Sequence, residues 1–419
     1  MLDEDRTILV VGAGQAGGTV AATLRQYGFK GRLTLIGSEP LLPYQRPPLS
    51  KAYLKTDVPP DALKLRPRSF YDEAGISLRL GEAVTAIDAA AKTVDLAGGD
   101  VLSYDILILA TGSQARKLQV PGADLDGLHE LRNQADAEKL KPAVRNSRRI
   151  AIVGAGYVGL EVAASARALG TEVVVVERES RVLARVASPQ LSGFVENHHR
   201  GRGVEILTDV SVTAFLGDGR GHVRALQLAD GRAIACDAAV VGIGALPCDA
   251  LALSAGLVCD NGVRVDAEAR TSDPSIYAIG DMTSRPLALY GGRYARLESV
   301  PNALEQARQA AASITGTAPP PPEIPWFWSD QYDLKLQMAG LGSGIDRTIV
   351  RGSPETGKFA LYHLSGERVV QVESVNLPTE FITAKTLLTT VRRIDPDALA
   401  DLAVPIKSDR IFLADAQLV

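Results

Sequence analysis

Apolar residues along this chain fall into short runs separated by glycine turns and helical patterns. Residues 7–11, 33–36, 104–110, 150–153, 172–177 and 237–242 consist mostly of apolar residues, which is typical of strands buried on both faces of a parallel sheet. Residues 20–27 and 162–169 have the spacing or small-residue content of buried helices. The order strand, helix, strand occurs twice, so the pattern predicts an α/β fold.

The first strand and helix are joined by a glycine motif, Gly12-Ala-Gly14-Gln-Ala-Gly17. In a dinucleotide-binding unit the first glycine allows a tight turn, the second lets a pyrophosphate approach, and the third lets helix and strand pack closely. The position for an acidic ribose contact falls at Ser38-Glu39. Glu39, or the hydroxyl and backbone of Ser38, is therefore the candidate contact.

A second glycine motif, Gly154-Ala-Gly156-Tyr-Val-Gly159, has its acid, Glu177, about 20 residues further on, where a ribose-binding acid is expected. A carboxylate there repels a 2′-phosphate and favours NADH. NADPH stays an alternative, because three arginines that could bind a 2′-phosphate are nearby in sequence: Arg178, Arg181 and Arg185. Residues 105–112 and 237–244 both end in glycine turns. This repeated ending indicates an internal duplication of the nucleotide fold.

Residues 271–281 read as a turn, a short apolar strand and then Gly280-Asp281, where a helix could begin. Gly280 would let the backbone approach a ligand, and Asp281 could accept hydrogen bonds from hydroxyls such as those of a ribityl chain. A second helix is predicted over 298–308, with Pro301 in its first turn and partial positive charge at its start.

Two proline-rich stretches divide the chain further. Residues 43–51 form either a plain surface loop or a rigid loop that holds Arg46 and Lys51 over a cofactor. Residues 317–325 form a stiff linker. Beyond it, alternating segments at 326–331, 336–341, 348–351, 360–363 and 369–375, with a helical pattern at 380–392, predict an α+β domain. The predicted division is 1–115 and 246–322 for a first nucleotide domain, 116–245 for an inserted second one, and 323–419 for the last.

Composition narrows the function classes. The 419 residues are 46% hydrophobic and 22% charged with a net charge of −4, which argues against general nucleic-acid binding. No apolar run approaches the ~18 residues that span a bilayer, and the acidic start at residues 1–5 does not resemble a signal peptide. We therefore expect no membrane association.

Cysteine and histidine patterns suggest no metal site. Three separated cysteines, Cys236, Cys248 and Cys259, fit a reduced cytoplasmic setting without disulfides or zinc. The five histidines include one adjacent pair, His198-His199, which we interpret as a solvated helix end.

Seven stretches together resemble one family, the FAD-dependent ferredoxin reductases of bacterial oxygenase systems. They are GAGQAG at Gly12, RPPLSK at Arg46, ATG at Ala110, GAGYVGLE at Gly154, TSDPSIYAIGD at Thr271, ESVPNALEQAR at Glu298 and PWFWSDQ at Pro325. RPPLSK and PWFWSDQ are the most specific of these, and the resemblance runs from the first strand into the last domain. It implies a glutathione-reductase-like fold with two Rossmann-type domains and a C-terminal α+β domain.

The resemblance also implies site residues. FAD contacts would fall on Ala16, Ser38, Lys51, Val84, Arg132, Asp281 and Val300, although Ser38 stands where the family often has an acid. The full set of expected cofactor residues combines the motifs with these positions: Gly12, Gly14, Ala16, Gly17, Ser38, Glu39, Arg46, Lys51, Val84, Ala110, Thr111, Gly112, Arg132, Gly154, Gly156, Tyr157, Val158, Gly159, Glu161, Glu177, Arg185, Gly244, Gly280, Asp281, Glu298, Ser299, Val300 and Trp328.

By the same resemblance, NADH would reduce FAD, and the flavin would pass single electrons to a 2Fe-2S ferredoxin that serves an oxygenase, such as a haem monooxygenase. Lys51 would lie near flavin N5 and pair with Glu161. Trp328 would lie at the flavin edge, or else anchor the core of the last domain. Arg66, Arg68, Arg308 and Lys407 would form a basic docking face, or be scattered solvated charges. The protein would be a monomer or a weak dimer.

Other functions of this fold make different demands. A disulfide reductase needs a cysteine pair beside the flavin, and a peroxidase or water-forming NADH oxidase needs one cysteine there. The stretch that directly follows Glu39, where such a cysteine would lie, has none. A quinone reductase would need an amphipathic membrane helix, and residues 379–393 are short and mixed. An NADH oxidase, a quinone reductase and a non-enzymatic redox-sensing flavoprotein are the alternatives.

Overall fold

The computed structural model describes residues 5–390 and 392–413. The chain forms two compact units, each made of separate segments. The first unit comprises Met1–Arg46, Pro59–Gln114 and Ala245–Pro325, and the second comprises Pro47–Val58, Ala115–Gly244 and Trp326–Val419. The three-domain division drawn from the sequence stays a prediction.

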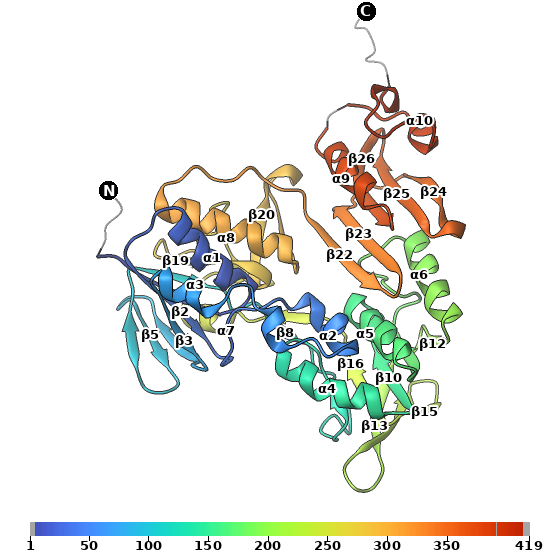
Figure 1. Cartoon of the computed structure of the whole chain (residues 1–419), viewed down its shortest axis with the longest axis horizontal. Helices are drawn as coiled ribbons and strands as arrows, with labels where there is room; N and C mark the ends of the chain where they lie inside the picture. The colour runs from blue at the N-terminus through green and yellow to red at the C-terminus, as the bar shows by residue number, and fades with distance from the viewer. Residues whose placement is uncertain (1–4, 391, 414–419) are drawn as a thin grey trace, which may run out of the picture. The chain divides into compact units, whose positions relative to one another are not determined.

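The first unit is built on a five-stranded parallel sheet in the order β19-β7-β1-β2-β3. Its strands are Ile276–Ala278, Ile106–Leu109, Thr7–Val11, Arg32–Gly37 and Ile76–Leu80. Helices α1 (Gln15–Gln26) and α8 (Val300–Thr315) lie side by side along it (Figure 1). Their small and aliphatic side chains form one buried cluster with Ile8, Val10 and Leu35. This layer supports the first glycine motif at the carboxyl end of β1.

Smaller elements complete the first unit. Two three-stranded sheets have the orders β4-β5-β6 (Val84–Asp88, Thr93–Leu96, Val101–Ser103) and β18-β20-β21 (Val263–Arg264, Thr283–Leu287, Arg293–Arg296), and β8 (Ser113–Ala115) pairs with β17 (Ala245–Pro247). The short helices are α3 (Arg68–Glu73), α7 (Ala250–Ser254), η2 (Pro60–Leu63) and η4 (Ala288–Tyr290). The helix foreseen after Gly280 is a single 3₁₀ turn, η3 (Gly280–Met282), because Thr283–Leu287 at once pairs as β20.

The second unit repeats this plan. Its parallel sheet has the order β12-β11-β10-β16-β9, with strands Val204–Leu207, Glu172–Val176, Arg149–Val153, Ala238–Val241 and Leu128–His129. A three-stranded sheet, β13-β14-β15 (Val212–Gly217, Val223–Leu228, Ala233–Ala235), corresponds to β4-β5-β6. Strand for strand, β10 corresponds to β1, β11 to β2 and β16 to β7. The topology therefore agrees with the duplication expected from the sequence.

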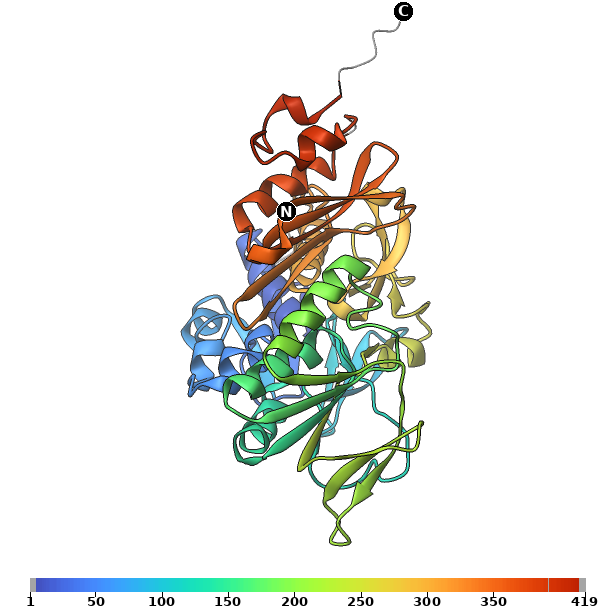
Figure 2. The same cartoon turned by 90° about the vertical axis from the view of Figure 1, so that its right-hand side faces the viewer.

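Helices of the second unit include α4 (Gln134–Asn146), α5 (Tyr157–Ala168), α6 (Pro189–Gly201), and the short η1 (Pro47–Ser50) and α2 (Ala52–Lys55). The residues after the proline linker form an antiparallel sheet, β22-β23-β26-β25-β24, with strands Trp326–Gln331, Leu334–Gly340, Arg368–Val375, Lys358–Ser365 and Arg347–Ser353. Figure 2 shows this sheet in orange and red with its helices α9 (Pro378–Leu387) and α10 (Pro396–Ala400). The 3₁₀ turns η5 (Pro354–Thr356) and η6 (Asp409–Ile411) complete it.

The helix predicted over 380–392 is too long. Helix α9 ends at Leu387, and residue 391 lies outside the described residues. The chain leaves the helix because the backbone N–H of Ile394 donates to the carbonyl of Glu367, and Arg393 pairs with the Glu367 carboxylate. These long-range bonds tie the segment to the β25–β26 turn, and local helix propensity does not report them.

Within residues 5–390 and 392–413, no helix is long and apolar enough to cross a membrane, and no group of three or more His, Cys, Asp or Glu side chains could hold a metal ion. Residues 1–4 of the acidic start lie outside that range.

Candidate active site

The first glycine loop, residues 12–17, has a geometry that requires glycine at two positions. Gly12 has φ +115°, and a Cβ placed there would lie 2.2 Å from the carbonyl oxygen of Ala110. A Cβ on Gly17 would lie 1.8 Å from the Gly12 carbonyl. Gly14 differs, because a Cβ there would have nothing within 4 Å. Open space therefore faces Gly14 at the start of α1.

The amino end of α1 suits an anionic group. Its N-cap residue is Gly14, which has no side chain to bond the first-turn N–H groups, and the first turn holds no acid. Uncapped helix N–H groups and the helix dipole favour phosphate. The loop therefore fits the pyrophosphate of a dinucleotide.

Gly280 and Asp281 lie next to the first glycine loop. Gly280 has φ +82°, and its ideal Cβ would lie 3.1 Å from Cβ of Ala16. Its backbone N–H donates to Gln306 Oε1 at 2.8 Å, and Ser113 Oγ donates to Asp281 Oδ2 at 3.1 Å. The ends of β1, β7 and β19 thus bring Gly12, Ala16 and Asp281 together, and their contact with a cofactor stays a prediction.

Other predicted residues of the first unit lie in recognisable places. Glu39 accepts hydrogen bonds from Tyr44 Oη at 2.7 Å and from Arg46 at 2.8 Å, while Ser38 is exposed. Arg46 therefore pairs with Glu39, which sequence reasoning did not foresee. Which of Ser38 and Glu39 contacts the ribose stays a prediction.

Three further predicted positions of the first unit lie at or near the starts of β4 and α8. Val84 begins β4. Glu298 pairs with Arg296. Ser299 is the N-cap of α8 and accepts from the Asn302 N–H, so that helix begins at Val300 rather than Glu298. Pro301 lies in the first turn, as predicted.

The second glycine loop, residues 154–159, has the same design. A Cβ on Gly154 would lie 2.5 Å from the Gly242 carbonyl oxygen, one on Gly159 would lie 2.2 Å from the Gly154 carbonyl, and one on Gly156 would meet nothing within 4 Å. The acid at the end of β11 is integrated into the loop, because Glu177 accepts from the Ala155 N–H at 2.6 Å and from the Glu179 N–H at 2.9 Å.

Five other predicted residues of the second unit are placed as follows. Val158 is 45% exposed in the first turn of α5. The ideal Cβ of Gly244 would lie 3.4 Å from the Arg185 guanidinium. The backbone N–H of Arg132 donates to Asp136 at the start of α4. The Tyr157 ring packs edge-on against Phe327 at 4.4 Å, and burial raises the pKa of its phenol well above the usual value.

A buried ion pair joins the proline-rich loop to α5. Lys51 Nζ lies 2.8 Å from Glu161 Oε2, and the two side chains are 15% and 5% exposed. This confirms the pairing predicted from the sequence. Two further hydrogen bonds hold this segment: Lys51 Nζ also donates to the Pro47 carbonyl at 3.1 Å, and Ser165 Oγ donates to the Ser50 carbonyl at 2.7 Å.

Two serines that sequence reasoning missed complete the surroundings of Glu161. Ser50 Oγ donates to Glu161 Oε2, and Ser329 Oγ donates to Oε1 at 2.6 Å. Strand β22 packs against α5 and presents Phe327, Ser329 and Gln331 on one face, since side chains alternate along a strand. That period of two was the available signal, because the PWFWSDQ stretch had already been singled out.

Trp328 lies on the other face of β22. It is half-buried, and its ring centroid lies 5.7 Å from that of Trp326 at an interplanar angle of 34°. Trp326 in turn contacts Phe381 of α9, with ring centroids 6.1 Å apart, and carries Lys385 Nζ 4.8 Å from its ring centroid. Trp328 is thus more exposed than the core-anchor interpretation expects.

The interpretation of His198-His199 as a solvated helix end is wrong. Both residues lie in the last turn of α6, as expected, but His199 is 0% exposed and its Nε2 lies 2.8 Å from Gln331 Oε1. The ring of Tyr332 covers His199 edge-on at 5.0 Å. His198 is the more accessible residue and bonds Asp333 at 2.9 Å. The sequence could not show this, because β22 and β23 cover the helix end only after the chain returns.

Comparisons with known proteins identify the family. Residues 6–307 match the family described as pyridine nucleotide-disulphide oxidoreductase, and residues 326–409 match the family described as reductase C-terminal. The chain belongs to the pyridine nucleotide-disulphide oxidoreductase family. The probable ferredoxin reductase CtmF of Castellaniella defragrans is 46% identical over 405 residues, which cover 97% of this chain and 99% of the relative.

Two solved structures are similar to this family member over nearly its whole length. Putidaredoxin reductase in its covalent complex with putidaredoxin has a TM-score of 0.93 and 40% identity, covering 97% of this chain and 98% of that chain. The ferredoxin reductase for the CYP199A2 system from Rhodopseudomonas palustris has a TM-score of 0.93 and 40% identity, covering 96% and 99%. The predicted resemblance and fold class are confirmed, and FAD and NAD(H) are the cofactors.

Despite the family's name, Cys236, Cys248 and Cys259 form no disulfide in the part of the chain that the structure describes. Burial raises the pKa of the Cys236 thiol to about 11 and also raises that of Cys259, so neither of these two is an activated thiolate at neutral pH.

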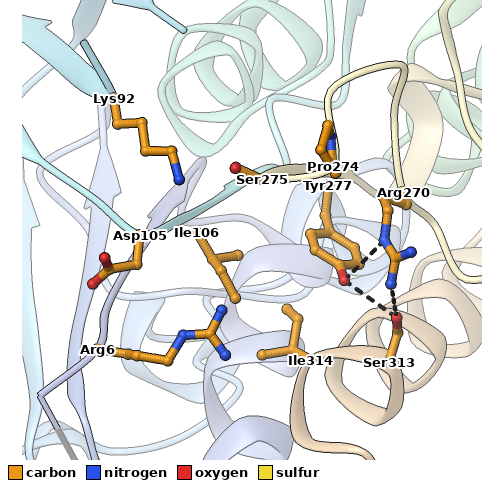
Figure 3. Close-up of a pocket in the computed structure, with 10 residues that line it drawn as sticks. All are labelled: Arg6, Lys92, Asp105, Ile106, Arg270, Pro274, Ser275, Tyr277, Ser313 and Ile314. Atoms are coloured by element: carbon orange, nitrogen blue, oxygen red, sulfur yellow. Dashed lines mark hydrogen bonds between the residues drawn. The ribbon is translucent and has the colours of Figure 1, made fainter. Parts of the chain in front are cut away.

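Two hollows in the first unit lie at opposite edges of its parallel sheet. The larger, about 600 Å³, is lined by Thr111, Pro247, Cys248 and Asp249 at the carboxyl edge, where α/β proteins bind ligands. The smaller, about 350 Å³, lies where β1, β7 and β19 begin (Figure 3). Positive charge in this hollow comes from Arg6, Lys92 and Arg270. The carboxylates of Asp105 and of Glu268, which pairs with Arg270, balance part of that charge. We assign no ligand to it.

The predicted basic docking residues lie on exposed or half-exposed surface. In the first unit Arg66 stacks on the Phe70 ring at 4.4 Å, Arg68 lies 3.9 Å from Asp72, and Arg308 pairs with Glu323 at 2.8 Å. Lys407 is exposed in the second unit. Carboxylates therefore offset two of the four charges.

Proposed function

We propose that this chain is an FAD-dependent reductase that takes electrons from NADH and passes them singly to a 2Fe-2S ferredoxin serving an oxygenase such as a haem monooxygenase. The observation that carries the proposal is the buried Lys51–Glu161 pair, in a family member whose described residues form no disulfide. The charged pair supplies a polar reaction site. A soluble carrier protein accepts the electrons that a redox-active disulfide accepts in other members of the family. The similarity to CtmF and putidaredoxin reductase supports this reading.

Each glycine loop takes one dinucleotide in this proposal. The first binds the FAD pyrophosphate over Gly14, with Asp281 accepting ribityl hydroxyls and Ser38 or Glu39 near the ribose. The second binds NADH over Gly156, with Glu177 facing the ribose hydroxyls. Bound FAD supplies the chemistry, by accepting a hydride and releasing electrons one at a time.

The remaining predicted residues support these two sites. Lys51 is held at one place by Glu161 and the Pro47 carbonyl, so its ammonium offers a fixed positive charge at the reacting ring. Trp328 covers an exposed edge of the flavin. The edges of the two sites are formed by Val84, Ala110 to Gly112, Arg132, Val300, Tyr157, Val158, Arg185 and Gly244. We propose the domain boundaries predicted from the sequence: residues 1–115 and 246–322 bind FAD, residues 116–245 bind NADH, and residues 323–419 form the α+β domain.

Ferredoxin docking is proposed on a face that includes Arg66, Arg68, Arg308 and Lys407. Arg66 and Lys407 have no carboxylate within ion-pair distance among the described residues, whereas Arg308 has Glu323. Arg66→Glu should therefore raise the ferredoxin KM several-fold, more than Arg308→Gln does, and the difference should shrink at 0.5 M salt. Equal KM values for Arg66→Glu and the unchanged protein would remove Arg66 from the face. We also propose a cytoplasmic location, which fits the small number and wide spacing of the cysteines, and a monomer or weak dimer.

The deciding experiment is NADH-driven cytochrome c reduction by the purified yellow protein, with and without an added 2Fe-2S ferredoxin. The proposal expects turnover to depend strongly on the ferredoxin. A one-iron rubredoxin, added in place of the ferredoxin, is the control carrier with a different metal centre. Fast turnover with oxygen or quinone, and no response to any ferredoxin, would indicate an oxidase or a quinone reductase.

Lys51→Ala tests the role of the ion pair. Reduction of the bound flavin by NADH in rapid mixing should slow at least tenfold while FAD stays bound, because the fixed positive charge is lost. Lys55→Ala, four residues further along the same segment, is the matched control. An unchanged reduction rate in Lys51→Ala would exclude the proposed role.

A further inference from the structure

Glu161 is the end of a longer buried hydrogen-bond chain. Ser329 Oγ donates to Glu161 Oε1 at 2.6 Å, Gln331 Nε2 donates to Ser329 Oγ at 3.1 Å, and Gln331 Oε1 lies 2.8 Å from His199 Nε2. Ser329, Gln331 and His199 are each 0% exposed, and Glu161 is 5% exposed. The fully buried residues link α6 to the Lys51–Glu161 pair through strand β22.

The direction of every hydrogen bond in this chain is fixed by its charged end. A carboxylate that pairs with Lys51 can only accept, so the single Ser329 hydrogen points to Glu161. Ser329 must then accept from the amide nitrogen of Gln331, which leaves the amide oxygen facing His199. His199 must therefore donate through Nε2–H.

The opposite direction requires a different state of Glu161. If His199 carried its proton on Nδ1, Nε2 would accept, the Gln331 amide would be flipped, and the Ser329 hydrogen would point to Gln331. A serine lone pair would then face Glu161 Oε1, which is favourable only if that carboxyl carries a proton. Such a proton would weaken the ion pair with Lys51. The tautomer of a buried histidine is therefore linked to the reaction-site pair.

We infer that His199, Gln331 and Ser329 form a donor chain that positions Glu161, holding its Oε1 so that Oε2 is left for Lys51 and Ser50. The inference rests on the proposed function, because it concerns the same Lys51–Glu161 pair. The three are positioning residues and act through Glu161. His199 is neutral in this arrangement, with its hydrogen on Nε2 and a bare Nδ1 that has no partner among the described residues.

The first test measures the tautomer directly. The holo-protein labelled with ¹⁵N-histidine is studied at pH 7 by long-range ¹H–¹⁵N correlation, and the His199 signal is assigned by its absence from His199→Gln. We expect the neutral Nε2–H pattern. A neutral Nδ1–H pattern would overturn the inference, and this readout needs no turnover.

The second test reverses the chain at its middle. Gln331→Glu keeps the shape of the side chain but provides acceptors at both ends, so the new carboxylate takes the Ser329 hydrogen away from Glu161. The rate constant of flavin reduction at saturating NADH should fall at least tenfold, while the dissociation constant of NADH changes less than twofold. Gln331→Met leaves Ser329 able to donate to Glu161 and should cost less. Equal losses in the two variants would mean a packing role and would overturn the inference.

Ser329→Ala covers the case in which Gln331→Glu does not fold, since it removes the donor to Oε1 without adding a charge. It should lower the same rate constant with NADH affinity preserved, and an unchanged rate would count against the chain. His198→Gln, at the adjacent position outside the chain, is the matched control and should reduce at the original rate. An unaltered protein whose flavin NADH fails to reduce would contradict the proposed function, and the His199 tautomer would then decide the inference alone.

Discussion

The two glycine loops have the same backbone design and differ in how they use the acid that follows them. In each loop the first and third glycines are required by close backbone contacts, and the second faces open space. Glu177 is built into the second loop, since it accepts from the Ala155 N–H. Glu39 instead bonds Tyr44 and Arg46 outside the first loop. A duplicated fold thus keeps its backbone requirements while side-chain roles diverge.

The comparison is tested most strongly at the glycines that face open space. Gly14→Ala should leave the first unit folded but weaken FAD retention at least tenfold, because the added methyl group occupies the space that the pyrophosphate needs. Gly156→Ala should keep FAD bound and raise the NADH dissociation constant at least tenfold. FAD content after gel filtration and NADH titration of the flavin spectrum measure the two effects.

Matched controls are available in both units. Gly98 and Gly193 also have nothing within 4 Å of an added Cβ and no positive φ. Gly98→Ala and Gly193→Ala should therefore leave both cofactors bound. Loss of FAD from Gly156→Ala, or of NADH affinity alone from Gly14→Ala, would contradict the assignment of one cofactor to each loop.

The second difference between the units is their response to acid, because all five histidines belong to segments of the second unit. Burial is the main cause that lowers the pKa of His199 to about 4, and the positive charges of His198 and Arg202 act in the same direction. An unfolded histidine has a pKa near 6.5. His199 therefore contributes stability above pH 6.5 that is lost as the pH falls toward 4, about 3 kcal/mol over the window.

Both tryptophans, Trp326 and Trp328, also belong to the second unit, so tryptophan fluorescence reports its unfolding. The urea midpoint should fall between pH 6.5 and 4, and His199→Gln should remove most of that slope. His198→Gln should keep most of it, because burial lowers the pKa of His198 as well, but less than that of His199. Equal slopes in the unaltered protein and His199→Gln would show that another group causes the acid sensitivity. His129, whose pKa is also lowered by burial, would be the next candidate.

The contrast between His199 and the glycine loops shows what sequence can predict here. Strands β1, β2, β10 and β11 were located almost to the residue, because their apolar runs are bounded by glycine turns whose backbone demands are local. The Lys51–Glu161 pair was foreseen through family resemblance. His199 was misjudged because its burial depends on β22, more than 120 positions away in sequence. Ser50 and Ser329 were missed for the same reason.

The two acids give the next comparison. Glu177→Ala leaves the buried Ala155 N–H without an acceptor, which should destabilise the second unit by about 1–3 kcal/mol. The change should also narrow the preference for NADH over NADPH, since it removes the charge that repels a 2′-phosphate. The tryptophan urea midpoint and the two kcat/KM values measure these effects. An unaltered ratio of kcat/KM values would exclude Glu177 as the discriminating residue.

Glu39→Ala should have the smallest effect. Its partner Arg46 and Glu39 itself are 27% and 31% exposed, so solvent screens the pair, and its loss should cost about 0–1 kcal/mol. If Ser38 supplies the ribose contact, FAD affinity will fall less than threefold in Glu39→Ala and more in Ser38→Ala. If Glu39 supplies it, the order reverses, and the Arg46 contact is then a means of aiming the carboxylate. FAD binding to the apoprotein, followed by flavin fluorescence quenching, separates the two cases. Glu39 would then contact a ribose as Glu177 is proposed to do. The Arg46 side chain would hold the Glu39 carboxylate, whereas the Ala155 backbone N–H holds that of Glu177.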